Sequence, residues 1–312
     1  MNAWHEMSPV MRMMALTIAL LVVSSIAVAL LRRSRPGSNY SELTARVNSW
    51  WTMAAVFFAA LLVDARISLV FFALLSFWAL KEFVTLLETR RADHRALFWA
   101  FAAIPVQYFL IGVGWYGMFV LFIPVYMFLF LPLRLILAGD PRGFVRSVSQ
   151  LQWGLMAFVF GLSHLGALLW FREPLPGDRV DGRTLVLFLV FVTEMSDVLQ
   201  YVWGKLLGRH KILPTISPNK TWEGFIGGVL STAVLSLAVR FLTPFPVWET
   251  FVVSLLITVT GFFGGAVMSA VKRDIGVKDF GALIPGHGGI LDRVDALCYS
   301  APLFFHYVRY FY

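Results

Sequence analysis

Long apolar runs are the feature that most constrains this chain. Several of them equal or exceed the ~20 residues that a helix needs to cross the hydrocarbon core of a bilayer, and 59% of the 312 residues are apolar. Only 14% of the residues are charged, whereas a soluble domain carries about 25%. A buried soluble core therefore does not explain the runs. The sequence predicts an all-α, polytopic integral membrane helical bundle with about nine or ten transmembrane helices.

The runs are separated by short polar segments, without repeats or a soluble domain. Basic residues follow the first run, which indicates an anchoring helix instead of a cleavable signal peptide. The chain is read as one continuous membrane domain, with an N-terminal transmembrane region at 1–180 and a C-terminal catalytic region at 181–312. Two runs are short, and for the run at 50–63 a hairpin that does not fully cross is an alternative. The predicted spans are 10–31, 50–63, 67–88, 96–112, 115–137, 151–171, 184–204, 224–242, 250–271 and 295–312.

Basic residues are distributed unevenly between alternate loops. One set of loops holds 17 Lys and Arg residues and the other holds 4, which predicts that the first set is cytoplasmic. The net charge of +8 therefore reflects membrane topology and anionic ligands, and a nucleic-acid partner is not expected. If all ten spans cross, both termini lie outside. The basic set comprises 32–48, 89–95, 138–149, 205–222 and 272–293, so the last two of these segments are expected on one face.

A dense polar cluster occupies residues 269–296, near the end of this apolar chain. Asp292 and Asp295 are three residues apart at the expected start of the last helix, so they share a helix face. Two convergent carboxylates suit Mg²⁺, which often binds one or two carboxylates together with phosphate oxygens. An alternative is that the two acids simply cap and solvate the helix.

Cations share this segment with the acids. Lys272, Arg273 and Lys278 are compatible with ordinary charges flanking a membrane span, but beside Asp279 they also suit the binding of phosphates. Glycines and a proline surround His287 and allow a tight turn, in which backbone N–H groups of Gly288 and Gly289 can cradle phosphate oxygens. A structural role for His287 is the alternative.

A second polar segment, 208–228, contains "SPNKT" and is expected to form a turn followed by a helix. Thr221 is predicted to cap that helix, and Lys220 lies just before its positive end, where a phosphate is favoured. Glu194 and Asp197 lie inside the preceding span on one face. Ionisable residues there usually face a cavity or a partner, so Asp197 is expected near the same chemistry, and a structural ion pair is the alternative.

The segment Ser269–Asp295 resembles the signature of the phosphatidate cytidylyltransferases, also called CDP-diacylglycerol synthases. "SPNKTWEG" at 217–224 is similar to a second element of that family, and together the resemblance covers roughly the last 120 residues. One element departs from the family, because "DVLQY" at 197–201 stands where small residues usually follow the acid, which bears on the shape of the pocket. The matching signature positions are Ser269, Lys272, Arg273, Lys278, Asp279, Pro285, His287, Gly288, Gly289, Asp292, Arg293 and Asp295.

The resemblance implies transfer of a cytidylyl group from CTP to phosphatidate, in phospholipid biosynthesis. It implies a multi-pass protein, of the bacterial inner membrane, whose active site faces the cytoplasm. The implied cofactor is Mg²⁺, as one or two divalent cations, with a monovalent cation also allowed, and a homodimer is left open. The implied catalytic residues are Asp292, Asp295, Lys272, Arg273, Lys278 and His287; the substrate-binding residues are Ser217, Asn219, Lys220, Thr221, Arg293, Gly288 and Gly289; and the metal ligands are Asp292, Asp295, Asp197 and Asp279.

Three alternatives to this reaction remain open at the level of sequence. The departure at 197–201 leaves room for a related enzyme that uses another membrane phosphate acceptor or another nucleotide. In a transporter, Glu194 and Asp197 would line a pathway, although a pathway does not need the spacing of the C-terminal signature. The third alternative is an inactive paralogue that binds a partner.

Overall fold

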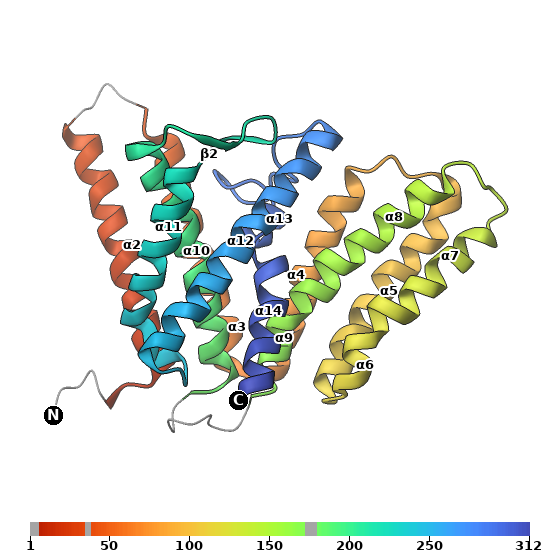
Figure 1. The fold of residues 1–312 in the computed structure, drawn as a ribbon, viewed down its shortest axis with the longest axis horizontal. Helices are drawn as coiled ribbons and strands as arrows, with labels where there is room; N and C mark the ends of the chain where they lie inside the picture. Colours follow the sequence, from red (N-terminus) through yellow and green to blue (C-terminus); the bar gives the residue numbers. More distant parts are fainter. Residues whose placement is uncertain (1–5, 35–38, 172–179) are drawn as a thin grey trace.

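The computed structural model describes residues 6–34, 39–171 and 180–312. Within these ranges nine helical segments are long and apolar enough to cross a membrane, so the chain is an all-α, multi-pass membrane protein. Figure 1 shows them side by side, with the start of α2 and the end of α14 at the same end of the bundle. The first and last helices thus begin and end at the same end of the bundle, and the expectation that this end is outside stays a prediction.

Five spans make up the first part of the chain after α2, and two of them contain an irregular turn. A π-helical turn interrupts the α6–α7 span, and another interrupts the α8–α9 span. The elements are α2 (Pro9–Ser34), α3 (Ser41–Val63), α4 (Ala65–Thr85), η1 (Arg91–Asp93), α5 (His94–Gly112), α6 (Tyr116–Leu121), η2 (Phe122–Met127), α7 (Phe128–Ile136), α8 (Phe144–Gly154), η3 (Leu155–Gly161) and α9 (Leu162–Leu168).

The remaining elements carry most of the predicted site residues. They include a small antiparallel hairpin, which is the only sheet among the described residues. They are α10 (Gly182–Leu207), β1 (Lys211–Leu213), β2 (Ser217–Thr221), α11 (Trp222–Ser236), η4 (Leu237–Leu242), α12 (Val247–Ile275), α13 (Leu291–Val294) and α14 (Leu297–Phe311).

Two local predictions about these elements were wrong. The short run at 50–63 is the second part of a helix that begins at Ser41 and has 23 residues. The first turns of that helix carry Glu42, Arg46 and Asn48, and these polar residues lower the hydropathy there and hide the full length of the helix. "SPNKT" forms strand β2, paired with β1, and not a turn. The cap was predicted correctly, since the Thr221 hydroxyl accepts a hydrogen bond from the Gly224 N–H at 3.2 Å.

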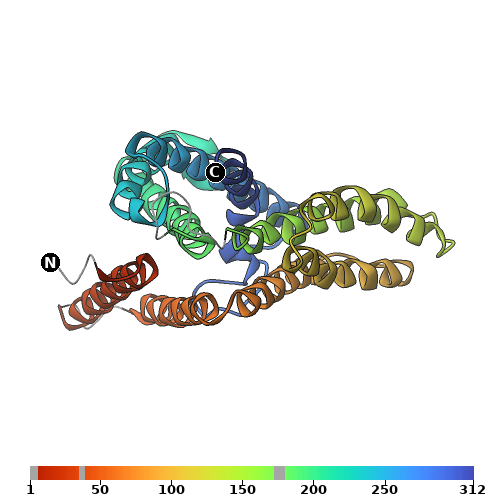
Figure 2. The ribbon, with the colours of Figure 1, turned by 90° about the horizontal axis from the view of Figure 1, so that it is seen from below.

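Two groups of helices share one core. Helices α10, α11, α12 and α14 pack together, and α9 joins them to the N-terminal part by packing on both α14 and α4. Figure 2 shows α2, α3, α4 and α5 following one another along one side of the molecule. Aromatic side chains fill the centre of the core, where Phe158, Phe188, Phe304 and Phe305 are fully buried.

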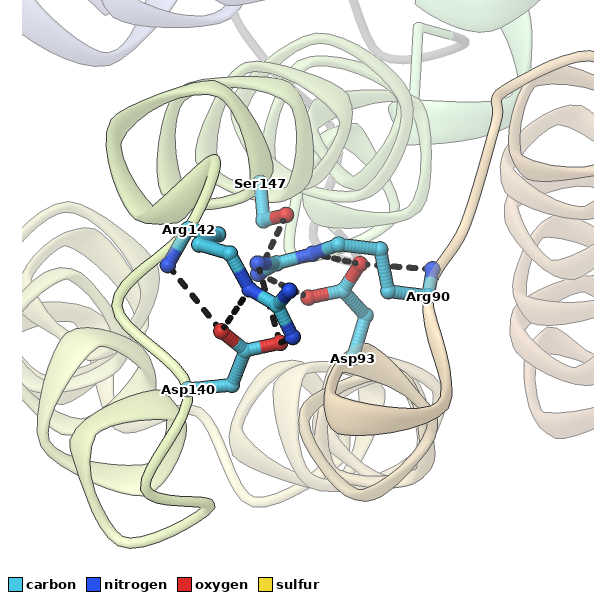
Figure 3. Close-up of polar contacts among 5 residues, drawn as sticks. All are labelled: Arg90, Asp93, Asp140, Arg142 and Ser147. Carbon is cyan, nitrogen blue, oxygen red and sulfur yellow. Dashed lines mark hydrogen bonds and ion pairs between the residues drawn. The ribbon is translucent and has the colours of Figure 1, made fainter.

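The loops of the predicted cytoplasmic set lie at one end of the bundle. In Figure 1 the β hairpin, the α12–α13 segment and the α4–α5 and α7–α8 connections are all at the top. Figure 3 shows how the last two are joined: the Arg90 guanidinium donates to Asp93 at 2.9 Å and to Ser147 at 3.1 Å, and Asp140 accepts from Arg142 at 3.0 Å. Burial alone would raise the pKa of Asp93, but the hydrogen bonds from Arg90 and Ser147 outweigh it and lower that pKa.

Candidate active site

The segment between α12 and α13 is folded into a tight loop. Helix α12 ends where Gly276 adopts a φ of 81°, and a second turn follows at Gly286 and Gly288, with φ angles of 75° and 81°. At that turn the N–H of Ile284 donates to the Gly288 carbonyl at 2.8 Å, and the N–H of His287 donates to the Ile284 carbonyl at 2.9 Å. The positive φ angles favour glycine, so the predicted turn around His287 is present.

The Asp292 side chain lies inside this loop and holds it together through hydrogen bonds. Its Oδ1 accepts a hydrogen bond from Lys272 Nζ at 2.9 Å, and its Oδ2 accepts the N–H groups of Phe280 at 2.8 Å and Gly289 at 3.0 Å. The side chain is 4% exposed. These contacts order the loop and use most of the carboxylate's capacity to accept bonds. The role of Asp292 as a metal ligand stays a prediction.

Lys220 and Asp295 meet across α12 at Gly265. A side chain on Gly265 would begin 3.3 Å from Lys220 Nζ and 3.9 Å from Asp295 Oδ2. Lys220 also lies over the Phe262 ring at 4.4 Å, and it interacts electrostatically with Asp197, Asp295 and Lys272. Burial lowers the pKa of Lys220, and the two carboxylates oppose that shift. The two polar segments of the sequence therefore come together at one place.

The β hairpin is joined to the end of α12. Arg273 Nε donates to the Ile216 carbonyl at 3.2 Å, which directs this cation to the hairpin. Ser217 is partly buried and Asn219 is exposed on β2, and neither lines the pocket described next. Their role in substrate binding stays a prediction.

A pocket of about 750 Å³ opens between α3, α10 and the loop. Acidic residues from α3, α10 and the loop line it, and basic residues come from three segments, so it is lined with charges of both signs. Six of the predicted site residues line it, namely Asp197, Lys278, Asp279, His287, Gly288 and Arg293. Its other lining residues are Glu42, Arg46, Trp50, Glu194, Val198, Tyr201, Gly281, Ala282, Ile284, Pro285 and Gly286.

His287 is held at the wall of this pocket by α3. Its ring meets the edge of Trp50, with centroids 5.9 Å apart, and the Ser49 hydroxyl donates to the Pro285 carbonyl at 2.8 Å. Burial lowers the pKa of His287, and the positive charges of Arg293 and Arg46 lower it further. The imidazole is thus neutral near pH 7.

Glu82 on α4 is a site residue that sequence reasoning missed. It is 8% exposed, and its carboxylate accepts the N–H groups of Ile290 at 3.0 Å and Leu291 at 2.8 Å, at the start of α13. Gly281 and Gly289 lie so close to it that a Cβ on either would collide with the carboxylate. The sequence feature that could have identified Glu82 was the presence of an acidic residue inside an apolar span.

The departure at 197–201 has a structural explanation. Gln200 lies against α11, where a Cβ on Gly228 would collide with it, and its amide donates to the Ser196 hydroxyl at 2.6 Å. Gln200 therefore packs between α10 and α11 and does not line the pocket, whereas Val198 and Tyr201 do line it. Gly224 and Gly228 of α11 both lie against Gln200, so these two glycines allow the close approach of α10 and α11.

The acidic residues of the candidate site provide only part of a cation site. Among the described residues, no three His, Cys, Asp or Glu side chains are grouped as metal ligands. Asp197 and Asp295 both lie near Lys220 and interact with each other. Mg²⁺ often takes only one or two carboxylates and completes its shell with water and substrate phosphate. These two acids therefore suit a cation that substrate phosphate helps to hold.

The chain is similar in sequence to known proteins. The YnbB protein of Escherichia coli K12, described as uncharacterized, is 43% identical over 299 residues, which are 95% of this chain and 97% of YnbB. Phosphatidate cytidylyltransferases of Staphylococcus haemolyticus and Staphylococcus aureus are 41% and 42% identical over 127 residues. That region is 40% of this chain and 49% of each staphylococcal protein.

The family profile covers far more of the chain than these staphylococcal matches do. The profile described as "Cytidylyltransferase family" matches residues 44–311. This range includes α3 and α4, which contribute Arg46 and Glu82 to the site, as well as both polar segments near the C-terminus. The chain therefore belongs to the cytidylyltransferase family.

Proposed function

We propose that the chain transfers the cytidylyl group of CTP to phosphatidate and forms CDP-diacylglycerol and pyrophosphate. The observation that carries this proposal is the convergence of Lys220, Asp197 and Asp295 from three distant parts of the chain. Membership in the cytidylyltransferase family and the names of the staphylococcal relatives support the substrates.

The reaction needs alignment more than a strong base. An oxygen of the lipid phosphate forms a bond to the α-phosphorus of CTP, and the bond from that phosphorus to the bridging oxygen of the β-phosphate breaks. The lipid phosphate is already an anion, so no proton must be removed. The barrier lies mainly in the repulsion between the two anions, and positioned cations lower it.

Seven charged residues near the site have a role in this proposal. Lys220 neutralises the triphosphate, and Arg293 and Lys278 face the pocket where the two phosphates meet. Asp292 keeps Lys272 and the loop in place. When Mg²⁺ is bound, at Asp197 and Asp295, it supplies a positive charge for the phosphate oxygens.

The location and partners follow from the same proposal. CTP is a soluble nucleotide, so the open end of the site faces the cytoplasm, at the inner membrane of a bacterium. The acyl chains of the acceptor stay in the bilayer, so the lipid reaches the pocket from the side. Whether two copies of the chain associate stays a prediction of the family resemblance.

A related acceptor is the second candidate, because Val198 and Tyr201 give the pocket an apolar side of its own. Purified protein in detergent, supplied with radiolabelled CTP, Mg²⁺ and a panel of lipid phosphates, separates the possibilities. CDP-diacylglycerol from phosphatidate is the expected product. A labelled product from another lipid phosphate alone would favour the second candidate, and no transfer to any acceptor would contradict both.

A further inference from the structure

Helix α3 turns one polar face towards the candidate active site. Glu42, Arg46 and Trp50 are spaced four residues apart, which places them on one side of a helix, and all three line the pocket. Opposite them, α10 contributes Asp197, Val198 and Tyr201. The N-terminal part of the chain, which the signature motifs do not include, thus forms one wall of the pocket.

Arg46 is the cation of this wall. Its side chain is 51% exposed and its guanidinium pairs with Glu42 at 2.6 Å, and the Glu42 side chain is itself 71% exposed. Such an exposed pair contributes little to stability. The pair has a single contact, from one guanidinium nitrogen to one carboxylate oxygen, whereas a phosphate can bind a guanidinium through two parallel hydrogen bonds. Arg46 can therefore exchange its carboxylate partner for a phosphate group without a large loss.

The surroundings of Arg46 suit an amphipathic phosphate better than a nucleotide. Val198 is 45% exposed and Tyr201 is 65% exposed, on a helix long and apolar enough to cross the membrane, so the apolar side of the pocket continues onto the lipid-facing surface. Asp197 lines this pocket and also interacts with Lys220. A phosphate beside Arg46 and a triphosphate beside Lys220 would thus lie on opposite sides of Asp197.

We infer that Arg46 binds the phosphate of the lipid acceptor, in a subsite whose walls are α3 and α10. The acyl chains leave this subsite past Val198 and Tyr201, while the nucleotide occupies the region of Lys220. This inference rests on the proposed function for its reaction, but the binding of the lipid can be measured without turnover.

Steady-state kinetics of Arg46→Gln provide the first test. The apparent KM for phosphatidate in mixed micelles should rise by about tenfold or more, since a charge-assisted contact is lost, while the KM for CTP should stay within about twofold. Arg146→Gln removes a comparable exposed pair with Glu88, 3.2 Å long, outside the pocket, and should change neither constant. An unchanged KM for phosphatidate, or a rise confined to CTP, would overturn the inference.

Glu42→Gln separates the loss of the ion pair from the loss of the guanidinium. This variant breaks the same pair but leaves Arg46 in place, so its KM for phosphatidate should not rise. A rise equal to that of Arg46→Gln would mean that the pair merely supports the wall, and would also overturn the inference.

A binding measurement tests the subsite without any turnover. Radiolabelled phosphatidate is added to the nucleotide-free protein, and diacylglycerol serves as the matching probe that lacks the phosphate. The unsubstituted protein should retain phosphatidate and not diacylglycerol, and Arg46→Gln should lose that preference. If phosphatidate is retained in this way but never converted, the proposed function fails and the subsite stands. Equal retention of phosphatidate by both proteins, or none by either, would overturn the subsite itself.

Discussion

Lys220 Nζ and Asp295 Oδ2 lie within 4 Å of the same point, the position at which a side chain on Gly265 would begin. They are 75 residues apart in the sequence, on a β strand and at the end of α13. Gly265 leaves the space in which they meet, because any side chain there would touch Lys220. This meeting of a cation and a carboxylate is the centre of the proposed site.

Asp295→Asn should lower the turnover of CTP at least about a hundredfold, because the site loses a negative charge on which the proposed cation depends. The measurement is formation of CDP-lipid by purified protein. Asp274→Asn is a matched control, since Asp274 is exposed at the end of α12. Near-normal turnover by a folded Asp295→Asn protein would remove Asp295 from the mechanism.

Lys220→Met should raise the KM for CTP about tenfold or more, because a partly buried ammonium group that faces the triphosphate is lost. Lys211→Met changes an exposed lysine on the neighbouring strand of the same hairpin and should leave the KM unchanged. The measurement is the KM for CTP of both variants, obtained by varying CTP at a saturating concentration of lipid. Equal effects of the two substitutions would show that only the overall charge of the hairpin matters.

Glu82→Gln should destabilise the protein by about 1–3 kcal/mol. The two backbone N–H groups at the start of α13 bond to different oxygens of the carboxylate, and the amide replaces one of those oxygens with an NH2 group that cannot accept. The loop that carries Arg293 and Asp295 would loosen, so turnover should also fall. Thermal unfolding in detergent and activity are the two measurements, with Glu88→Gln, an exposed glutamate close to α4 in the sequence, as the control.

Gly289→Ala tests the same contact from the other side. An added Cβ would collide with the Glu82 carboxylate, so this variant should behave like Glu82→Gln. Gly117→Ala has open space around the new methyl group and should be nearly neutral. If Gly289→Ala is also neutral, the contact with Glu82 does not hold the loop.

The pKa of His287 predicts a change of stability with pH. Burial, and then Arg293 and Arg46, lower its pKa below 6.5, so on acidification the unfolded chain takes up a proton at this residue before the folded protein does. Stability should therefore fall as the pH drops through about 6.5. His287→Gln should weaken that dependence when melting temperatures at pH 5.5 and 7.5 are compared. An identical dependence in both proteins would contradict it.

Removal of divalent cations should stop the reaction, since the proposed mechanism needs a cation between the carboxylates and the phosphates. The measurement is turnover with excess chelator, followed by the return of activity on addition of Mg²⁺. Full activity in the presence of chelator would contradict the metal ligands Asp197 and Asp295.

The amino-acid sequence alone was enough to predict the class of protein and the grouping of its loops. Apolar runs of this length have few ways to satisfy their backbone groups in lipid except as helices, and the bias of Lys and Arg between alternate loops grouped the polar segments on one face. The cap at Thr221 and the turn around His287 were also predictable, because both depend on neighbouring residues and on glycine's access to positive φ angles.

Which residues come together depends on the three-dimensional packing. Glu82 accepts the N–H groups of Ile290 and Leu291, more than 200 residues further along the chain. Arg46 pairs with Glu42 on its own helix but also lies against Gly286 of the distant loop. The sequence also does not show that Asp292 and Asp295 have different contacts, because both acids belong to one motif. In the structure Asp292 orders the loop, whereas Asp295 lies close to Lys220. Such contacts depend on the packing of α3, α4 and α12 around the loop, and a pattern of local spacing does not record how distant helices pack.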